Sequence, residues 1–314
     1  MSRPSSMPEP RVSVILPTHR RPDSLARLLD ALAVQDPGVE WELVVIDNDD
    51  APGSEGVFRS REDSFGGRAR FVRETRRGAA HARNRGIAEA RGAITAMIDD
   101  DVIPAPDWLA RLVAPLLAGR CAGTGGLVLL DPGVDRPGWF DEVALGGYLA
   151  RWDLGPEERP ITEKEFFLTA NCAFDTAKLR ASGGFEPTLG PRGKTPLVND
   201  DVQLVRRVRE LGGTLRWVPE AVVFHELTAA RLSKRYLLKR AYAQGRSDWI
   251  LERSTMTSRK LGGARVATSW LAIEIGRRRK EGFRRPKVRF HLATDLARTA
   301  GALREAARVA RRKS

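Results

Sequence analysis

Apolar runs alternate along the first part of the chain with segments whose apolar positions recur at helical spacing. Four short runs have the length and β-branched character of buried strands: 12–16, 41–46, 69–72 and 93–98. Helices are predicted to begin at Pro22, to extend over 79–90, and to extend over 108–117. This alternation of strand and helix predicts an α/β domain with a largely parallel sheet.

The pattern is less regular after residue 118. Further strands are expected at 123–130, 215–218 and 221–224, and an amphipathic helix is expected over 202–211. Residues 131–165 are rich in Pro, Gly and charge, so they can form either a lid over a binding site or an ordinary surface excursion. A Gly-, Ser- and Arg-rich segment after residue 50 is expected to be a loop.

Basic residues are concentrated in the last quarter of the chain. The net charge is +13, yet residues 227–314 hold 24 Lys and Arg against 6 Asp and Glu, whereas residues 1–226 hold 29 against 34. We therefore predict a disordered N-terminus at 1–10, a catalytic domain at 11–226 and a basic helical region at 227–314. The expected helices of that region are 231–243, 269–279 and 294–311.

Three interpretations of the basic region are open. Basic amphipathic helices bind anionic membrane surfaces, and this is the interpretation we favour. Nucleic acid is the second, although no zinc finger or helix-turn-helix signature supports it. The third is a solvated helix face packed on the domain. Two cysteines, no apolar signal core and no apolar run of about 20 residues predict a cytoplasmic protein. The favoured interpretation of the basic region would place this protein peripherally on the inner face of the cell membrane.

Polar clusters follow three of the predicted strands, at 17–21, 47–49 and 99–101. Ligands of open α/β sheets bind beyond the carboxyl ends of the strands, so these clusters are expected to form one site. No G-x-G-x-x-G or P-loop follows the first strand, which argues against a dinucleotide dehydrogenase or a P-loop kinase.

The acidic triplet Asp99-Asp100-Asp101 follows a buried strand directly. Three adjacent carboxylates repel one another, and a hard divalent cation with phosphate ligands would compensate them. The alternative is a solvated acidic turn. The neighbouring polar clusters favour the cation.

Eight short motifs occur in order: VSVILPTHRR (12–21), LVVIDND (43–49), RRGAAHARNRGIAEARG (76–92), IDDD (98–101), TANCAF (169–174), GGFE (183–186), NDDVQL (199–204) and WVPEAVVFH (217–225). Together they resemble the inverting family 2 glycosyltransferases over residues 11–226. The resemblance implies the GT-A fold, a Rossmann-like mixed sheet, followed here by the basic helical region. It also implies a role in bacterial polysaccharide biosynthesis.

The resemblance assigns most of the candidate residues to the donor. Asp99 would bind the nucleotide ribose, and Asp101 would bind Mg2+ or Mn2+ across the phosphates, although Asp100 leaves open which two carboxylates act. His225 would be a further metal ligand or a phosphate contact, or else a structural histidine. The remaining residues expected at the donor nucleotide are Pro17, Thr18, Arg21, Asp47, Asp49, Arg76, Arg83 and Asp100. At least two of the four arginines between 76 and 85 are expected on a solvated helix face.

An inverting transfer needs a general base, and the resemblance assigns Asp201 to this role, with Asp200 beside it. The alternative is that the pair only caps the following helix. A like-charged neighbour raises a carboxyl pKa, which suits a base only if the other acid is compensated. Asn171 and Glu186 match positions that line the acceptor and sugar pocket.

These observations predict a metal-dependent inverting glycosyltransferase. Its donor would be a nucleotide-diphosphate sugar, with a UDP-sugar favoured, and its acceptor a hydroxyl of a glycan or lipid-linked acceptor. The chain has no Q-x-x-R-W motif, because the segment 244–249 has a different spacing, so one sugar per encounter is expected. The alternative is a nucleotide-sugar-binding or nucleotidyltransferase-like protein without this activity.

Overall fold

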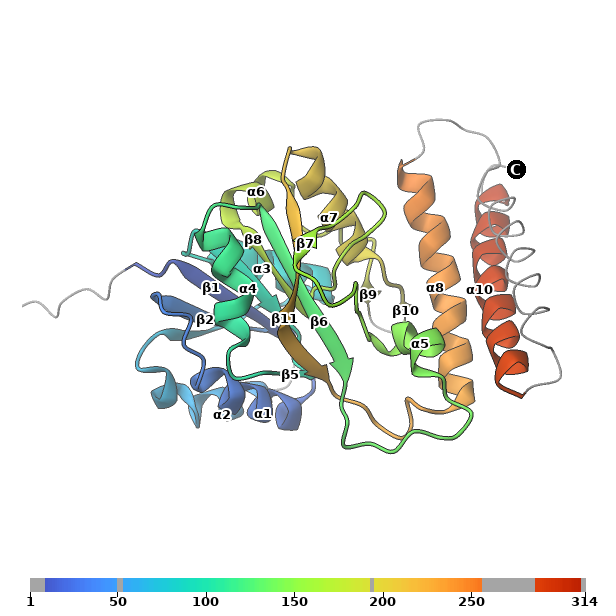
Figure 1. The fold of residues 1–314 in the computed structure, drawn as a ribbon, viewed down its shortest axis with the longest axis horizontal. Coiled ribbons are helices and arrows are strands. Elements are labelled where there is room, and N and C mark those ends of the chain that lie inside the picture. Colours follow the sequence, from blue (N-terminus) through green and yellow to red (C-terminus); the bar gives the residue numbers. More distant parts are fainter. Residues whose placement is uncertain (1–8, 50–52, 193–194, 256–285, 312–314) are drawn as a thin grey trace, which may run out of the picture. The chain divides into compact units, whose positions relative to one another are not determined.

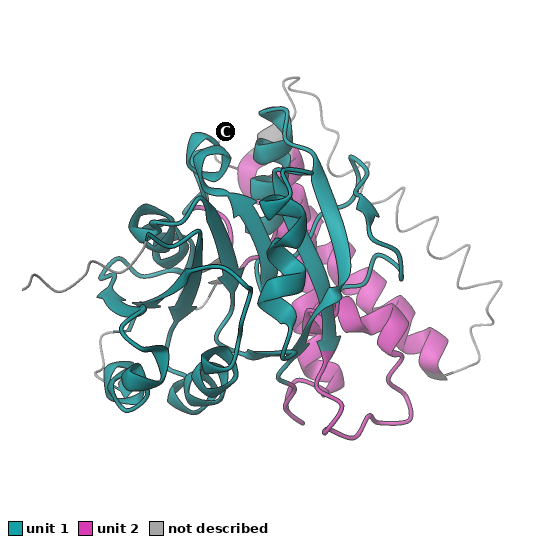
Figure 2. Cartoon of the chain, turned by 60° about the vertical axis from the view of Figure 1, so that its left-hand side comes forward, with its two compact units in different colours: residues 1–129, 152–187, 200–226 teal, residues 130–151, 188–199, 227–314 magenta. Residues whose placement is uncertain are grey.

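The computed structural model describes residues 9–49, 53–192, 195–255 and 286–311. The chain forms two compact units (Figure 2). The first comprises residues 1–129, 152–187 and 200–226, and the second comprises residues 130–151, 188–199 and 227–314. The second unit thus includes two segments that the sequence did not separate from the catalytic domain. The predicted N-terminal disorder falls largely on residues outside the described ranges.

One mixed sheet is the centre of the first unit (Figure 1). Within the described residues its order is β3-β2-β1-β4-β8-β6-β11-β5, and β7 pairs with β11. The strands are β1 (Val12–Thr18), β2 (Trp41–Asp47), β3 (Ala69–Arg73), β4 (Ile94–Ile98), β5 (Val102–Pro104), β6 (Gly123–Leu130), β7 (Arg159–Pro160), β8 (Asn171–Asp175) and β11 (Leu215–His225).

Only one half of the sheet is parallel. Strands β3, β2, β1 and β4 run parallel, but β8 is antiparallel to both β4 and β6, and β11 is antiparallel to β5 and β7. The expectation of a largely parallel sheet is therefore correct for four strands only. The parallel strands β1 and β2 are linked by a crossover helix, which is the connection that parallel pairing requires.

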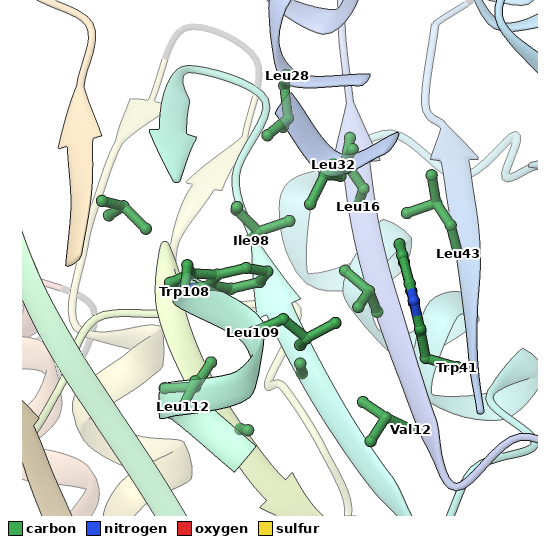
Figure 3. Packing of buried hydrophobic residues seen from close by; sticks show 14 of the residues in the cluster. Val12, Leu16, Leu28, Leu32, Trp41, Leu43, Ile98, Trp108, Leu109 and Leu112 are labelled. Carbon is green, nitrogen blue, oxygen red and sulfur yellow. The ribbon is translucent and has the colours of Figure 1, made fainter. Parts of the chain in front are cut away.

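Helices cover both faces of this sheet. In the first unit they are α1 (Pro22–Ala33), α2 (Gly53–Arg59), α3 (Ala79–Glu89), α4 (Trp108–Leu117), α6 (Thr176–Ala181) and α7 (Asp200–Glu210), with the 3-10 turn η1 (Glu62–Phe65). Leucines of α1 and the apolar face of α4 pack with Leu16 and Ile98 on one face of the sheet (Figure 3). On the other face, Ile15 and Ile46 pack with residues of α3 and α7. The alternation of Ile15 and Leu16 between two cores follows from the two-residue period of a strand.

Two local predictions were wrong. The expected loop after residue 50 contains α2 and η1, because Phe58 and Phe65 are fully buried there against aromatic residues of the sheet. The two strands expected at 215–218 and 221–224 form the single strand β11. Pro219 does not interrupt it, since the ladder contacts with β7 and β5 lie on either side of that residue.

The second unit is mainly helical. It contains α5 (Glu142–Leu145), the 3-10 turn η2 (Gly146–Leu149), the short pair β9 (Pro191–Arg192) and β10 (Thr195–Pro196), and the helices α8 (Lys234–Thr255) and α10 (Pro286–Ala310). Helix α8 is much longer than the predicted 231–243, and α10 begins before the predicted 294. The helix predicted at 269–279 lies outside the described residues. None of the described helices is both long and apolar enough to cross a membrane.

Candidate active site

The carboxyl ends of β1, β2 and β4 meet at one edge of the sheet. Thr18 is in register with Asp47, and Ile15 is in register with Met97, so the segments that follow these strands begin side by side. The sequence predicted this convergence from the polar residues after each strand. It brings residues together that are about eighty positions apart in the chain.

The first cluster forms around Asp100. One oxygen of this buried carboxylate accepts hydrogen bonds from Thr18 Oγ1 at 3.0 Å and from the His19 backbone N–H at 3.1 Å. Arg21 Nη1 lies 2.6 Å from the other oxygen and 2.9 Å from Asp101 Oδ2. Burial raises the pKa of Asp100 to about 6, although the Arg21 charge opposes this shift. Arg21 therefore holds two adjacent carboxylates together.

Asp101 also faces His225. The antiparallel pairing of β11 with β5 places His225 opposite Val102, and the Glu226 N–H donates to the Asp101 carbonyl at 2.8 Å. His225 Nε2 then lies 3.5 Å from Asp101 Oδ2, and both side chains are buried. His225 Nδ1 is 3.0 Å from the Glu226 carbonyl, which can only accept, so Nδ1 is the donor and Nε2 is the ring nitrogen that faces Asp101.

Asp101 Oδ2 and His225 Nε2 lie at nearly the distance that separates two ligand atoms of one metal ion. Two cis ligands of an octahedral Mg2+ or Mn2+ lie about 3 Å apart, and a carboxylate oxygen with an imidazole nitrogen is a chemically suitable pair. Within the described residues, no three His, Cys, Asp or Glu side chains form a metal-binding group by themselves. A cation held at Asp101 and His225 would need substrate or water oxygens to complete its shell.

Asp99 belongs to a second cluster, around Arg83. Arg83 Nη2 lies 2.7 Å from Asp99 Oδ1, and Arg83 Nη1 lies 3.0 Å from Asp200 Oδ2. The guanidinium is buried, and its carbon lies 5.4 Å from the centre of the Phe185 ring. Arg83 therefore joins the strand end that carries the acidic triplet to the start of α7.

Helix α3 positions this arginine by its close contact with the sheet. A Cβ on Gly86 would lie 2.9 Å from Ile46 and 3.0 Å from Ile15, so only glycine lets α3 approach β1 and β2 this closely. At the start of the helix, Asn48 donates to the Arg76 carbonyl and accepts from the Gly78 N–H, each at 2.8 Å.

The two acids at the start of α7 have different surroundings. Asp200 is buried and paired with Arg83, whereas no arginine in the described chain is within ion-pair distance of Asp201. Burial raises the pKa of Asp201, and the adjacent Asp200 charge raises it further. Burial also raises the pKa of Asp200, but Arg83 opposes that shift. Arg83 thus compensates the charge of Asp200. This is the condition under which the neighbouring Asp201 can act as a general base.

The other predicted donor residues lie around β2 and before α3. Asp47 is fully buried, accepts from the Asp49 N–H at 3.1 Å, and has a pKa raised by burial. Asp49 is bound by Arg20 at 3.0 Å. Pro17 is a half-buried β1 residue in register with Ile46.

The arginines between 76 and 85 divide as expected into exposed and buried residues. Arg76 is largely exposed and binds Glu74 at 2.8 Å, which lowers the Glu74 pKa to about 2. Arg85 is also exposed and binds Glu89, one helical turn away. Arg83 alone of these three is buried.

The two predicted pocket residues are placed differently. Asn171 is fully buried on β8 opposite Ile98. Its amide accepts from Trp108 Nε1 at 2.8 Å and donates to two backbone carbonyls, so it fixes α4, β6 and β11 to β8. Glu186 is half-exposed and lies 3.9 Å from Arg207. Their roles toward an acceptor stay predictions.

Two arginines have a structural role that was not predicted from the sequence. Arg21 and Arg83 were assigned to the nucleotide only, yet both neutralise buried carboxylates. Phe185 was also missed, although it lies within the GGFE motif next to Glu186. The signal for the role of the arginines was the excess of acids at 99–101 and 200–201. Five buried or half-buried aspartates need nearby cations.

Comparison with known proteins identifies the family. The sequence model of the family described as "Glycosyl transferase family 2" matches residues 13–178, which is more than half of the chain. The chain belongs to glycosyltransferase family 2.

Relatives of this family 2 glycosyltransferase match it over most of its length. It is 27% identical over 297 residues to glycosyltransferase AglE of Haloferax volcanii, covering 92% of this chain and 86% of that protein. It is 26% identical over 253 residues to the glucosyl-dolichyl phosphate glucuronosyltransferase of the same organism, covering 77% of each.

A solved structure confirms the fold. The mannosyltransferase PcManGT from Pyrobaculum calidifontis, in complex with GDP-Man and Mn2+, superposes with a TM-score of 0.63 at 20% identity. The match covers 95% of this chain and 87% of that one. The family 2 glycosyltransferase described here therefore has the GT-A fold that its motif order predicted.

Replacement of Arg83 by Met should destabilise this family 2 glycosyltransferase by about 3 kcal/mol near pH 8, because it leaves two carboxylates without their partner. Burial would then raise the Asp200 pKa further above its unfolded value. The destabilisation is therefore present above that pKa and decreases as the pH falls through it. Urea unfolding at about pH 8 and pH 5.5 measures both effects.

Arg85→Met, on the exposed face of the same helix, is the control and should change the free energy of unfolding by less than about 1 kcal/mol. Equal losses in the two variants would contradict the bridging role.

Proposed function

We propose that this protein is a metal-dependent inverting glycosyltransferase. It transfers one sugar from a nucleotide-diphosphate sugar to a hydroxyl of a glycan or lipid-linked acceptor. The observation that carries the proposal is the asymmetry at the start of α7, where Arg83 compensates Asp200 and leaves the adjacent Asp201 with a raised pKa. An acid in that state binds and releases a proton near neutral pH.

The proposed reaction is a single displacement. The acceptor hydroxyl oxygen attacks the anomeric carbon of the donor while the bond from that carbon to the diphosphate oxygen breaks. Asp201 takes the hydroxyl proton, and the nucleoside diphosphate leaves with the electron pair of the broken bond. Attack opposite to the leaving group inverts the anomeric configuration, so one base is sufficient.

The donor would lie at the strand ends. Asp47 would contact the base, and Asp99 would contact the ribose with the oxygen that does not face Arg83. Arg21 is half-exposed while it holds Asp100 and Asp101, so it is available to a phosphate group from its exposed side. One feature was not predicted from the sequence. Asp99 and Asp101 belong to different clusters, Asp99 with Arg83 and Asp101 with Arg21.

Asp101 and His225 would hold Mg2+ or Mn2+, because their facing atoms have nearly the spacing of two ligands of one cation. When bound, the cation would neutralise charge that develops on the diphosphate. The Mn2+ in the structure of PcManGT supports a divalent metal in this fold. Two nucleotides are candidates for the donor. The sequence favours a UDP-sugar, whereas PcManGT was solved with GDP-Man.

We also propose a position on the inner face of the membrane. The name of one relative, glucosyl-dolichyl phosphate glucuronosyltransferase, describes a lipid-linked acceptor, which supports such an acceptor here. Lipid-linked acceptors are presented at a membrane surface, and the basic charge of residues 227–314 suits anionic lipid.

The proposed base is tested by Asp201→Asn, which should reduce the turnover number by about 10²–10⁴-fold while donor affinity changes little. Sugar release and nucleotide binding are measured separately on the same preparation. Asp107→Asn, an exposed acid at the start of α4, is the matched control and should keep full turnover. Full turnover in Asp201→Asn would remove the base assignment. A protein that binds donor without turnover in any form would support the alternative of a binding protein.

Donor and metal are tested together by thermal stabilisation. The wild-type protein should be stabilised by one of UDP-, GDP- or dTDP-sugars, and only when Mg2+ or Mn2+ is present. Asp101→Asn should raise the metal concentration needed for half of this effect by roughly tenfold, because it replaces a charged carboxylate ligand by a neutral amide oxygen. Stabilisation that is the same in the presence of EDTA would contradict the metal site.

A further inference from the structure

Helix α10 packs with an unusual orientation of its side chains. Its buried residues include His291, Thr294, Asp295, Thr299 and Glu305, of which Glu305 has no exposed surface. Its outward residues include Leu296 and Leu303, with 48% and 40% of their surface exposed. The usual amphipathic helix buries its leucines and exposes its charged groups. Helix α10 departs from this pattern at two points: it buries both of its acids and exposes Leu296 and Leu303, although Val288, Phe290 and Ala302 are buried as usual.

Specific contacts with α8 fix this orientation. The two helices lie side by side (Figure 1). A Cβ on Gly245 would lie 1.7 Å from the Arg298 carbonyl oxygen, and a Cβ on Gly301 would lie 2.0 Å from the Tyr242 carbonyl oxygen. The helix backbones are therefore in direct contact at both glycines, and neither helix can rotate without losing that contact.

Ion pairs around the buried Glu305 and beside Asp248 hold the same face inward. Arg246 binds Glu305 at 2.6 Å, and Arg308 binds the other oxygen of Glu305 at 2.7 Å. Arg298 binds Asp248 at 2.6 Å. Rotating α10 to bury its leucines would separate Glu305 from Arg246 and Arg298 from Asp248, the two pairs that join α10 to α8, at a large cost. The leucines face outward because the polar contacts determine the packing.

The outward face combines apolar residues with cations. Leu296 and Leu303 lie seven positions apart, with Ala300 and Ala307 exposed between and beyond them. The exposed cations along the helix are Lys287, Arg289, Arg304, Arg308 and Arg311. The acids of α10 are Asp295 and Glu305, and both are buried. The described outward face of this helix thus has leucine, alanine and basic residues and no acid.

We propose that this outward face of α10 binds the surface of a membrane that contains anionic lipid. Leucines of this kind enter the boundary between headgroups and acyl chains, while arginine stems extend along it and keep their charges at the phosphates. The inference rests on the membrane position proposed above and names the surface responsible for it.

Other occupants fit the face less well. A second copy would place basic residues against basic residues without an acid to compensate them. Residues 256–285 carry nine Lys and Arg against two Glu, so this segment has the same sign of charge as the face. Nucleic acid would use the cations, but phosphate contacts give no role to the two exposed leucines.

The experiment compares vesicle binding of three full-length proteins at low salt. They are the wild type, Leu296→Ser/Leu303→Ser, and the control Val34→Ser/Leu211→Ser, which changes two exposed apolar residues of the first unit. The wild type should sediment with vesicles of phosphatidylcholine and phosphatidylglycerol and not with phosphatidylcholine alone. The α10 variant should need roughly tenfold more lipid, and the control should stay within about twofold of the wild type.

Three results would overturn the proposal. The first is equal vesicle binding by the wild type and the α10 variant, or binding by neither. The second is tighter binding of a short DNA duplex than of anionic vesicles at the same salt concentration, unchanged in the α10 variant. The third is a wild-type dimer that becomes a monomer in the α10 variant, measured by light scattering.

A soluble acceptor separates this proposal from the proposed function. Transfer to that acceptor should be equal in all three proteins, because neither variant changes a residue of the candidate active site. Loss of vesicle binding with intact transfer, in the wild type, would overturn only the lipid proposal. Intact vesicle binding without transfer would overturn only the glycosyltransferase proposal.

Discussion

The candidate active site depends on the bridge that Arg83 makes between Asp99 and Asp200. This bridge joins the end of β4 to the start of α7 across more than a hundred residues of sequence. Arg83 can reach both carboxylates because Gly86, three residues later on α3, allows the helix to lie directly on β1 and β2. A buried guanidinium between a half-buried and a buried carboxylate is stable only as a complete set, so each of the three residues fixes the others.

The ion pairs of Arg83 also affect the protonation of the neighbouring carboxyl groups. Five aspartates, at 99–101 and 200–201, lie around two arginines, Arg21 and Arg83. The acids therefore exceed the nearby cations, and burial raises the pKa values of Asp100, Asp200 and Asp201. A bound divalent cation beside Asp101 would relieve part of this excess, and a proton on Asp201 would relieve another part. These are the two events that the proposed reaction needs.

Most of the first unit could be predicted from the sequence, because its strands and helices have clear hydrophobic periods and its motifs follow strand ends. The residues of the site were predicted better than the ion pairs and hydrogen bonds between them. Arg83 was assigned to the donor nucleotide, since periodicity does not show which carboxylates a buried guanidinium will contact. Helix α2 was missed because the burial of Phe58 depends on distant aromatic residues. The burial of both acids of α10 was not predicted for the same reason: Gly301 and Glu305 contact residues of α8, which lie more than fifty positions away in the sequence.

The central claim is that Arg83 compensates Asp200 so that Asp201 can act as the base. It is tested most directly by the pH dependence of turnover in the wild type and in Asp200→Asn, with donor saturating. The wild-type rate should rise with pH through a pKa well above about 4, the value of an ordinary aspartate. In Asp200→Asn the neighbouring negative charge is gone and Arg83 remains, so the acidic limb should move to lower pH. An acidic limb that stays in place, or moves to higher pH, would contradict the account.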